Sequence, residues 1–148
     1  MLVHVDDCTI AATSVKLIEE FKVGMKKHVK ITDLGELHWL LGIEIQRNRE
    51  RHTIHLSQCS YIDSILQHYH FNELKPMEIP METHICLLSS QSPSTTAELT
   101  RMCDIPYHEA VGSLMYAALG THPDIVFAVQ TMSRFTSKPR LAHWEAVK

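Results

Sequence analysis

The chain has 148 residues, which suits one modest domain or two small lobes. Hydrophobic residues make up 45% and charged residues 21%, a balance typical of a globular protein and not of a disordered one. The formal net charge of −3 argues against general binding of nucleic acid through a basic excess, so any such contact must come from local patches. No apolar run approaches the roughly 20 residues that span a bilayer. We therefore expect an intracellular protein with no membrane partner.

The first dozen residues predict a β-hairpin. Residues 1–5 and 8–12 are mostly apolar, and Asp6-Asp7 lies at the break between them. Thr13 or Ser14 can then cap a helix. The apolar stripe of that helix is Val15, Ile18, Phe21 and Met25.

The same predicted helix carries lysines at spacing four, Lys22, Lys26 and Lys30, which would share one face. Such a face could contact the phosphates of a nucleic acid. A simple solvated face explains the spacing as well. Both interpretations stay open at this point.

More β-structure is expected before residue 57 and mostly helix after it. The predicted strands are residues 29–34, which end at Gly35, then 39–47 and 53–56, with a solvated hairpin tip at 48–52. From Ser57 the apolar spacing becomes helical. Residues 89–100 are polar and rich in Ser and Thr, and predict an exposed loop.

Three helical segments are expected after that loop. The first has an apolar face of Tyr107, Val111, Leu114, Met115 and Ala118. The second opens with Pro123 in its first turn and Asp124 beside the helix dipole, and the third begins near Leu141. The pattern is still helical at Lys148, which suggests a piece of a longer protein.

The pair Asp6-Asp7, within His4-Val5-Asp6-Asp7, is the strongest candidate for chemistry. Nucleotidyl transfer uses two divalent cations, and Mg²⁺ prefers hard oxygen ligands such as carboxylates. A paired aspartate alone is more often a solvated turn, because Asp is a favoured turn residue. Here a strongly apolar strand flanks the pair on each side, and a helix and a Gly-containing hairpin follow, which is the order expected of a polymerase palm.

A series of motifs follows the aspartate pair in order along the chain. They are Asp33-Leu34-Gly35-Glu36, Leu41-Gly42-Ile43-Glu44-Ile45, Leu56-Ser57-Gln58 with Tyr61-Ile62, Val111-Gly112-Ser113-Leu114-Met115-Tyr116, Pro123-Asp124-Ile125, Ser133-Arg134-Phe135 and His143-Trp144-Glu145-Ala146. Over essentially its whole length the chain resembles the reverse transcriptase of copia-type retrotransposons, beginning at the catalytic Asp-Asp. Three positions depart from the family pattern: His4 replaces an aromatic residue, and His122 and Ile79 replace an Arg and a Thr.

The resemblance implies an α+β fold in two parts. Residues 1–57 would be the C-terminal half of a polymerase palm, made of antiparallel hairpins plus a helix, and residues 58–148 a helical thumb and connection region. Asp6 and Asp7 would be the catalytic residues and would hold Mg²⁺. Leu41 and Gly42 would support the primer terminus.

The same resemblance implies a fragment of an RNA-directed DNA polymerase from a retrotransposon polyprotein. Its partners would be an RNA or DNA template, a DNA primer and deoxynucleoside triphosphates, in a cytoplasmic virus-like particle. The family's palm carries another aspartate and the fingers earlier in the chain. We therefore expect this chain to need a missing N-terminal polymerase half and to be inactive alone.

Whether the chain is an enzyme at all stays open at this stage. The alternative function is a non-catalytic retroelement relic, or a module that binds nucleic acid or protein. An additional palm aspartate encoded upstream of Met1 would favour the polymerase, and stop codons there would favour the relic.

Overall fold

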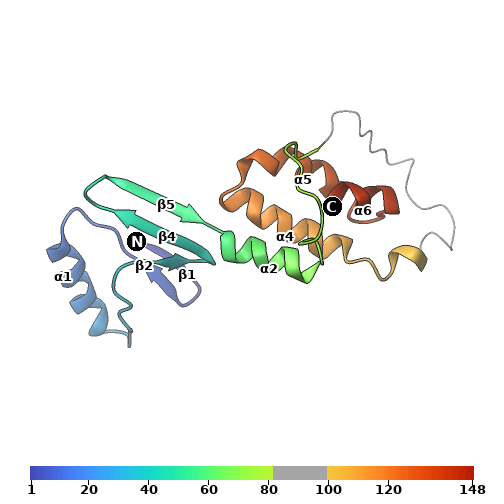
Figure 1. The fold of residues 1–148 in the computed structure, drawn as a ribbon. Helices are drawn as coiled ribbons and strands as arrows, with labels where there is room; N and C mark the ends of the chain where they lie inside the picture. The colour runs from blue at the N-terminus through green and yellow to red at the C-terminus, as the bar shows by residue number, and fades with distance from the viewer. Residues whose placement is uncertain (82–99) are drawn as a thin grey trace. The chain divides into compact units, whose positions relative to one another are not determined.

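A computed structural model describes residues 1–81 and 100–148, in two compact units, Met1–Leu40 and Leu41–Lys148 (Figure 1). The chain combines short antiparallel strands with several helices, so the predicted mixture of α and β structure is confirmed. The predicted loop at residues 89–100 falls outside the described residues, apart from Thr100. Within the described residues, no helix is both long and apolar enough to cross a membrane.

The first unit begins with the expected hairpin, which is shorter than predicted. Strand β1 (Leu2–His4) pairs antiparallel with β2 (Asp7–Thr9), in the register Leu2↔Thr9 and His4↔Asp7. Helix α1 (Val15–Lys26) follows, and the Ser14 hydroxyl caps it by accepting from the Leu17 N–H at 3.5 Å. No residue of α1 is fully buried.

The strand predicted at residues 29–34 is wrong, because this segment is irregular. Its first residue completes the end of α1, since the Val29 N–H donates to the Met25 carbonyl at 3.0 Å. At its other end the Asp33 carboxylate accepts from the Gly35 N–H at 3.0 Å, which forms an Asx turn. Both ends of the apolar run are therefore held in turns, and the run does not form a ladder.

The strand predicted at residues 39–47 is divided in two. Strand β3 (Trp39–Leu40) ends at a turn, and β4 (Ile43–Asn48) starts after it. Leu41 has φ +51° and Gly42 φ +78°, values that no regular strand accommodates. Strand β5 (Thr53–Ser57) pairs with β4 from Glu44↔Ser57 to Asn48↔Thr53. The predicted partner strand is therefore confirmed, and the hairpin tip is one residue shorter than predicted, because Asn48 belongs to β4.

The change to helix after residue 57 is also confirmed, and β5 runs directly into the first helix (Figure 1). The helices are α2 (Cys59–His68), α4 (Tyr107–Gly120), the 3₁₀ turn η2 (Pro123–Ile125), α5 (Val126–Ser133) and α6 (Leu141–Val147). Pro123 opens η2, as its fixed φ favours.

The described hydrophobic core lies among these helices. Tyr107 and Val111 are each only 1% exposed, and the Tyr107 hydroxyl donates to the Met132 carbonyl at 2.9 Å. Burial raises the pKa of Tyr107 to about 12. The other buried members are Met102, Ala110, Ala118, Ala128, Val129, Met132, Trp144 and Val147. Of the predicted face of α4, Met115 is an exception, because it is exposed.

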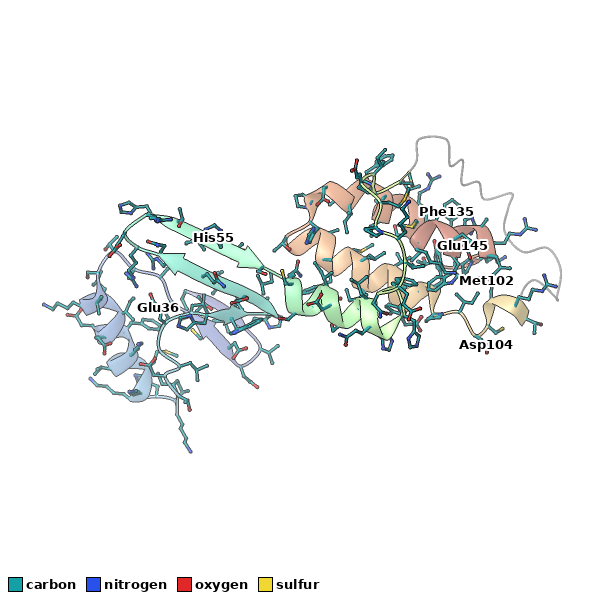
Figure 2. The ribbon with its side chains drawn as sticks, viewed as in Figure 1. Glu36, His55, Met102, Asp104, Phe135 and Glu145 are labelled. Carbon is teal, nitrogen blue, oxygen red and sulfur yellow. The ribbon has the colours of Figure 1, made fainter. Side chains whose placement is uncertain are left out.

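His143 is a buried polar residue among these helices, and the sequence pattern did not predict its burial. Its ring is fully buried and stacks on Phe135, with centroids 4.2 Å apart and planes 12° apart. Phe135, just beyond α5, and Glu145, on α6, both lie in this helical part (Figure 2). The His143 Nδ1 accepts from the Arg140 N–H at 3.0 Å, and Nε2 has no partner among the described residues. Burial, together with the nearby Arg140 charge, lowers the pKa of His143 below its usual 6.5.

Candidate active site

The aspartate pair lies at the tip of the β1–β2 hairpin. His4 and Asp7 are opposite each other in the register, so only Val5 and Asp6 connect the strands. Val5 has φ +52°. A positive φ at the first of two loop residues is typical of the tight turns that join β-hairpins, but glycine is the residue that adopts it easily. A β-branched residue in this conformation marks a strained turn, and such strain concentrates at functional sites.

Both carboxylates of the pair are available to a ligand. Asp6 lies in the turn itself, Asp7 is the first residue of β2, and both are exposed. Directly opposite residues of an antiparallel pair project to the same face, so the His4 imidazole and the Asp7 carboxylate share one face of the hairpin. The hairpin therefore presents two hard oxygen donors with an imidazole beside them.

These donors suit Mg²⁺ in chemistry but do not form a closed protein cage. Mg²⁺ in enzymes is held by one or two carboxylates and keeps waters or substrate phosphates as its other ligands. Across residues 1–81 and 100–148, no group of three His, Cys, Asp or Glu side chains is close enough to hold a metal ion. Asp6 and Asp7 fit the ion as a partial set of ligands.

The three candidate lysines differ in their surroundings. Lys22 and Lys26 belong to α1, but the helix ends at Lys26, so Lys30 lies beyond it and the predicted common face does not extend that far. The Lys22 ammonium pairs with Asp33 at 2.8 Å and with Glu19 at 3.8 Å. The Asp33 partnership raises the pKa of Lys22. Lys22 thus has its charge opposed within the protein.

Asp33 connects helix α1 to the segment that follows it. One carboxylate oxygen accepts from Lys22 and the other from the Gly35 N–H, where Gly35 has φ +80°. The hydrogen bond from Lys22, followed by the one from Gly35, lowers the pKa of Asp33. The Asp-Leu-Gly motif therefore forms a turn that is tied to α1.

The Leu41–Gly42 turn joins β3 to β4. Positive φ at both residues is the pattern of a type I′ turn, in which glycine at the second position relieves the strain. The hydroxyl of Tyr116, on α4, donates to the Leu41 carbonyl. A Cβ added to Gly42 would lie 3.2 Å from that hydroxyl, so the turn lies against the phenol.

Gln58, the N-cap residue of α2, makes a second set of contacts with α4 that the sequence pattern did not predict. Its side chain is 2% exposed. Its Nε2 donates to the Tyr116 carbonyl at 3.5 Å, and its Oε1 accepts from the Thr121 hydroxyl at 2.8 Å. The signal available in the sequence was that Gln58 and Tyr116 both belong to the family motifs, although the motifs do not say which residues meet.

Comparison with known proteins decides the family. Residues 1–83, which include the aspartate hairpin, Asp33 and the Leu41–Gly42 turn, match the family model for reverse transcriptase (RNA-dependent DNA polymerase). The chain belongs to the reverse transcriptase family. No solved structure matches it significantly.

Several of its relatives among curated proteins are retrotransposon proteins. The chain is 39% identical over its whole length to the retrovirus-related Pol polyprotein from transposon TNT 1-94 of Nicotiana tabacum, of which it covers 11%. It is 34% identical to the Pol polyprotein from transposon RE1 of Arabidopsis thaliana, again over the whole chain and 10% of the relative. A putative transposon Ty5-1 protein of Saccharomyces cerevisiae is 31% identical over 99% of the chain and 45% of its own length.

These matches confirm the resemblance to copia-type retrotransposon reverse transcriptases. The chain spans about a tenth of the length of the Pol polyproteins that it matches. The alignments continue past residue 83 to the end of the chain, so the helical segment is part of the shared sequence.

Proposed function

We propose that this chain takes part in template-directed DNA synthesis as a segment of a copia-type reverse transcriptase. The reaction would join a deoxynucleotide to the 3′ end of a DNA primer on an RNA or DNA template, with release of pyrophosphate. The observation that carries the proposal is the exposed Asp6-Asp7 pair on a strained hairpin turn, within the residues that match the family.

Asp6 and Asp7 would hold Mg²⁺ together with substrate phosphates. When bound, the ion would supply charge stabilisation and would lower the pKa of the attacking 3′ hydroxyl. We assign Asp6 the more direct role because it lies in the turn, whereas Asp7 begins β2 beside His4. His4 stands where the family has an aromatic ring, and we propose that its imidazole packs at the same position on the hairpin.

The other candidate residues would bind the nucleic acid without taking part in the chemistry. Leu41 and Gly42 would support the primer terminus through the backbone of their turn. Lys26 is exposed on α1 and is the lysine of that helix best placed to meet a phosphate, because Lys22 pairs with Asp33.

We also propose the division into palm, residues 1–57, and thumb and connection, residues 58–148. The change from strand to helix supports it, since β5 ends at Ser57 and α2 begins at Cys59. The compact units divide earlier, between Leu40 and Leu41, so the β4–β5 hairpin belongs to the same unit as the helices.

The proposal is tested by transplanting the chain. In a chimaera, this chain replaces the aligned segment of the tobacco transposon polyprotein, and primer extension is measured with Mg²⁺ on a homopolymer template. The unaltered tobacco polyprotein is the positive control, and a chimaera with both Asp6 and Asp7 changed to Asn is the negative control. We expect the first chimaera to extend primers and the second to be inactive. An active tobacco protein beside an inactive first chimaera would favour a non-catalytic relic.

A further inference from the structure

A cluster of polar side chains joins α2 to α4. Its members, which we call the α2–α4 cluster, are Gln58, Tyr61, Ser113, Tyr116 and Thr121. The buried Gln58 amide is engaged at both ends, by the Tyr116 carbonyl and the Thr121 hydroxyl. A buried amide without those partners would be destabilising. The two bonds therefore fix the position of the start of α2 relative to the end of α4.

The same cluster fixes the ring of Tyr116. The Tyr61 ring meets it edge-on, with centroids 4.7 Å apart and planes 76° apart, a favoured geometry for aromatic pairs. The ring makes this contact and would be kept in a phenylalanine, whereas the Tyr61 hydroxyl points to another partner and donates to the Ser113 carbonyl at 3.1 Å. Gln58 therefore restrains the backbone of Tyr116, and the Tyr61 ring restrains its side chain.

The free end of this restrained side chain reaches the Leu41–Gly42 turn. The Tyr116 hydroxyl donates to the Leu41 carbonyl, 75 residues away in the sequence. Leu41 holds a positive φ, which a residue with a side chain keeps only when its surroundings impose it. Tyr116 supplies such a constraint, and the close approach of Gly42 to the phenol leaves little room for a side chain there.

We infer that Tyr116 is a positioning residue, which holds the Leu41–Gly42 turn in the conformation that supports the primer terminus. The inference rests on the proposed function, because it takes the turn as the primer support. It adds that the turn is positioned from the helical segment, through one phenol hydroxyl. It also assigns a role to a residue beyond the part of the chain that matches the family model.

The test uses Tyr116→Phe, with Tyr61→Phe as its matched control. Both substitutions remove one phenol hydroxyl and keep the ring, but the Tyr61 hydroxyl bonds to α4 and not to the turn. In the active chimaera we expect Tyr116→Phe to raise the KM for primer–template about 3- to 10-fold, the effect of losing one hydrogen bond. The KM for the deoxynucleotide should stay within about twofold, and Tyr61→Phe should leave both constants within the same limit.

A second measurement on the chain alone separates positioning from folding. Amide hydrogen exchange of residues 41–45 should accelerate several-fold in Tyr116→Phe and not in Tyr61→Phe, while exchange in the core of α4 stays unchanged. Unchanged exchange at the turn, or accelerated exchange with an unchanged KM for primer–template, would overturn the inference. Failure of the proposed function looks different, because the Asp6/Asp7 double variant would then extend primers as its parent does, or the chimaera would be inactive.

Discussion

The side chain of Gln58 lies directly against Gly120, near the end of α4. A Cβ added to Gly120 would come within 2.6 Å of both Cδ and Nε2 of Gln58. Gln58 cannot retreat without breaking its bonds to Tyr116 and Thr121, and it is almost completely buried. Glycine at position 120 is therefore a packing requirement of the α2–α4 contact.

We expect Gly120→Ala to lower the free energy of unfolding by about 1–3 kcal/mol, the usual cost of overpacking a close contact. Gly112→Ala is the matched control, because it lies in the same helix and its added Cβ would meet nothing within 4 Å. That variant should gain up to about 1 kcal/mol from helix propensity. Urea denaturation followed by circular dichroism measures both. Equal effects of the two substitutions would contradict the packing that we describe.

The buried His143 predicts a pH dependence of stability. Its pKa is lowered in the folded chain, so the unfolded chain binds the proton more tightly. Stability from this residue is fully present above its usual pKa of 6.5 and is lost as the pH falls through 6.5 toward the lowered value. The loss should not exceed about 1.4 kcal/mol per pH unit.

Denaturation at pH 7.5 and 5.5 tests this dependence. The free energy of unfolding of His143→Gln should depend less on pH than that of the unchanged chain. His108 is exposed on α4, so His108→Gln should keep the full pH dependence. If His143→Gln does not fold, the ring of His143 can be titrated by NMR in the unchanged chain. A midpoint at or above 6.5 would refute the prediction.

The pair of Lys22 and Asp33 makes a second prediction about protonation. The hydrogen bond from Lys22 is the main cause of the lowered pKa of Asp33. Lys22→Met should therefore return that pKa toward its usual 3.8, whereas Lys16→Met should leave it unchanged, because Lys16 pairs with Glu20. Carbon-detected NMR titration of the Asp33 carboxyl measures the shift. The stabilisation from this ion pair is present above pH 3.8 and is lost as the pH falls through the lower folded value. An unshifted Asp33 in Lys22→Met would show that the pair does not form in solution.

Much of the fold can be predicted from local sequence patterns, and the two wrong strand predictions have local causes. The β1–β2 hairpin, α1 with its Ser14 cap, and the helices after residue 57 follow from apolar spacing and capping residues. The strand prediction at residues 29–34 was wrong because Asp33 makes a turn with Gly35 and an ion pair with Lys22. An apolar pattern indicates neither contact. The strand at residues 39–47 was divided because Gly42 marks a turn, which periodicity alone does not distinguish from a strand glycine.

For the candidate site, the sequence predicts residues but not their contacts. Asp6, Asp7, Leu41 and Gly42 follow from motif resemblance. The bond from Tyr116 to Leu41 joins residues 75 positions apart, so no local rule could predict it. The burial of His143 was also not predicted, because its stacking partner Phe135 lies outside α6, in the segment between α5 and α6.

The lysines of α1 predict a difference in salt dependence of primer–template binding by the chimaera. Lys26→Ala should weaken binding modestly and reduce the slope of log K against log salt by about 0.9 at most, the value for one phosphate contact. Lys22→Ala should change the slope less, because Asp33 already opposes its charge. Fluorescence anisotropy at several salt concentrations measures both slopes. A larger change for Lys22→Ala than for Lys26→Ala would reverse our assignment.

The most direct test of the central claim is single-turnover primer extension by the Asp6→Asn chimaera. The substitution removes a negative charge with almost no change in size, so circular dichroism should show an unchanged fold. We expect the rate of nucleotide addition to fall by roughly a thousandfold, because charge stabilisation by a bound metal ion amounts to several kcal/mol. Asp7→Asn should reduce the rate less, and Asp63→Asn, an exposed substitution on α2, should not reduce it. If Asp6→Asn extends primers at the parental rate, the aspartate hairpin is only a turn and the assignment of the active site is wrong.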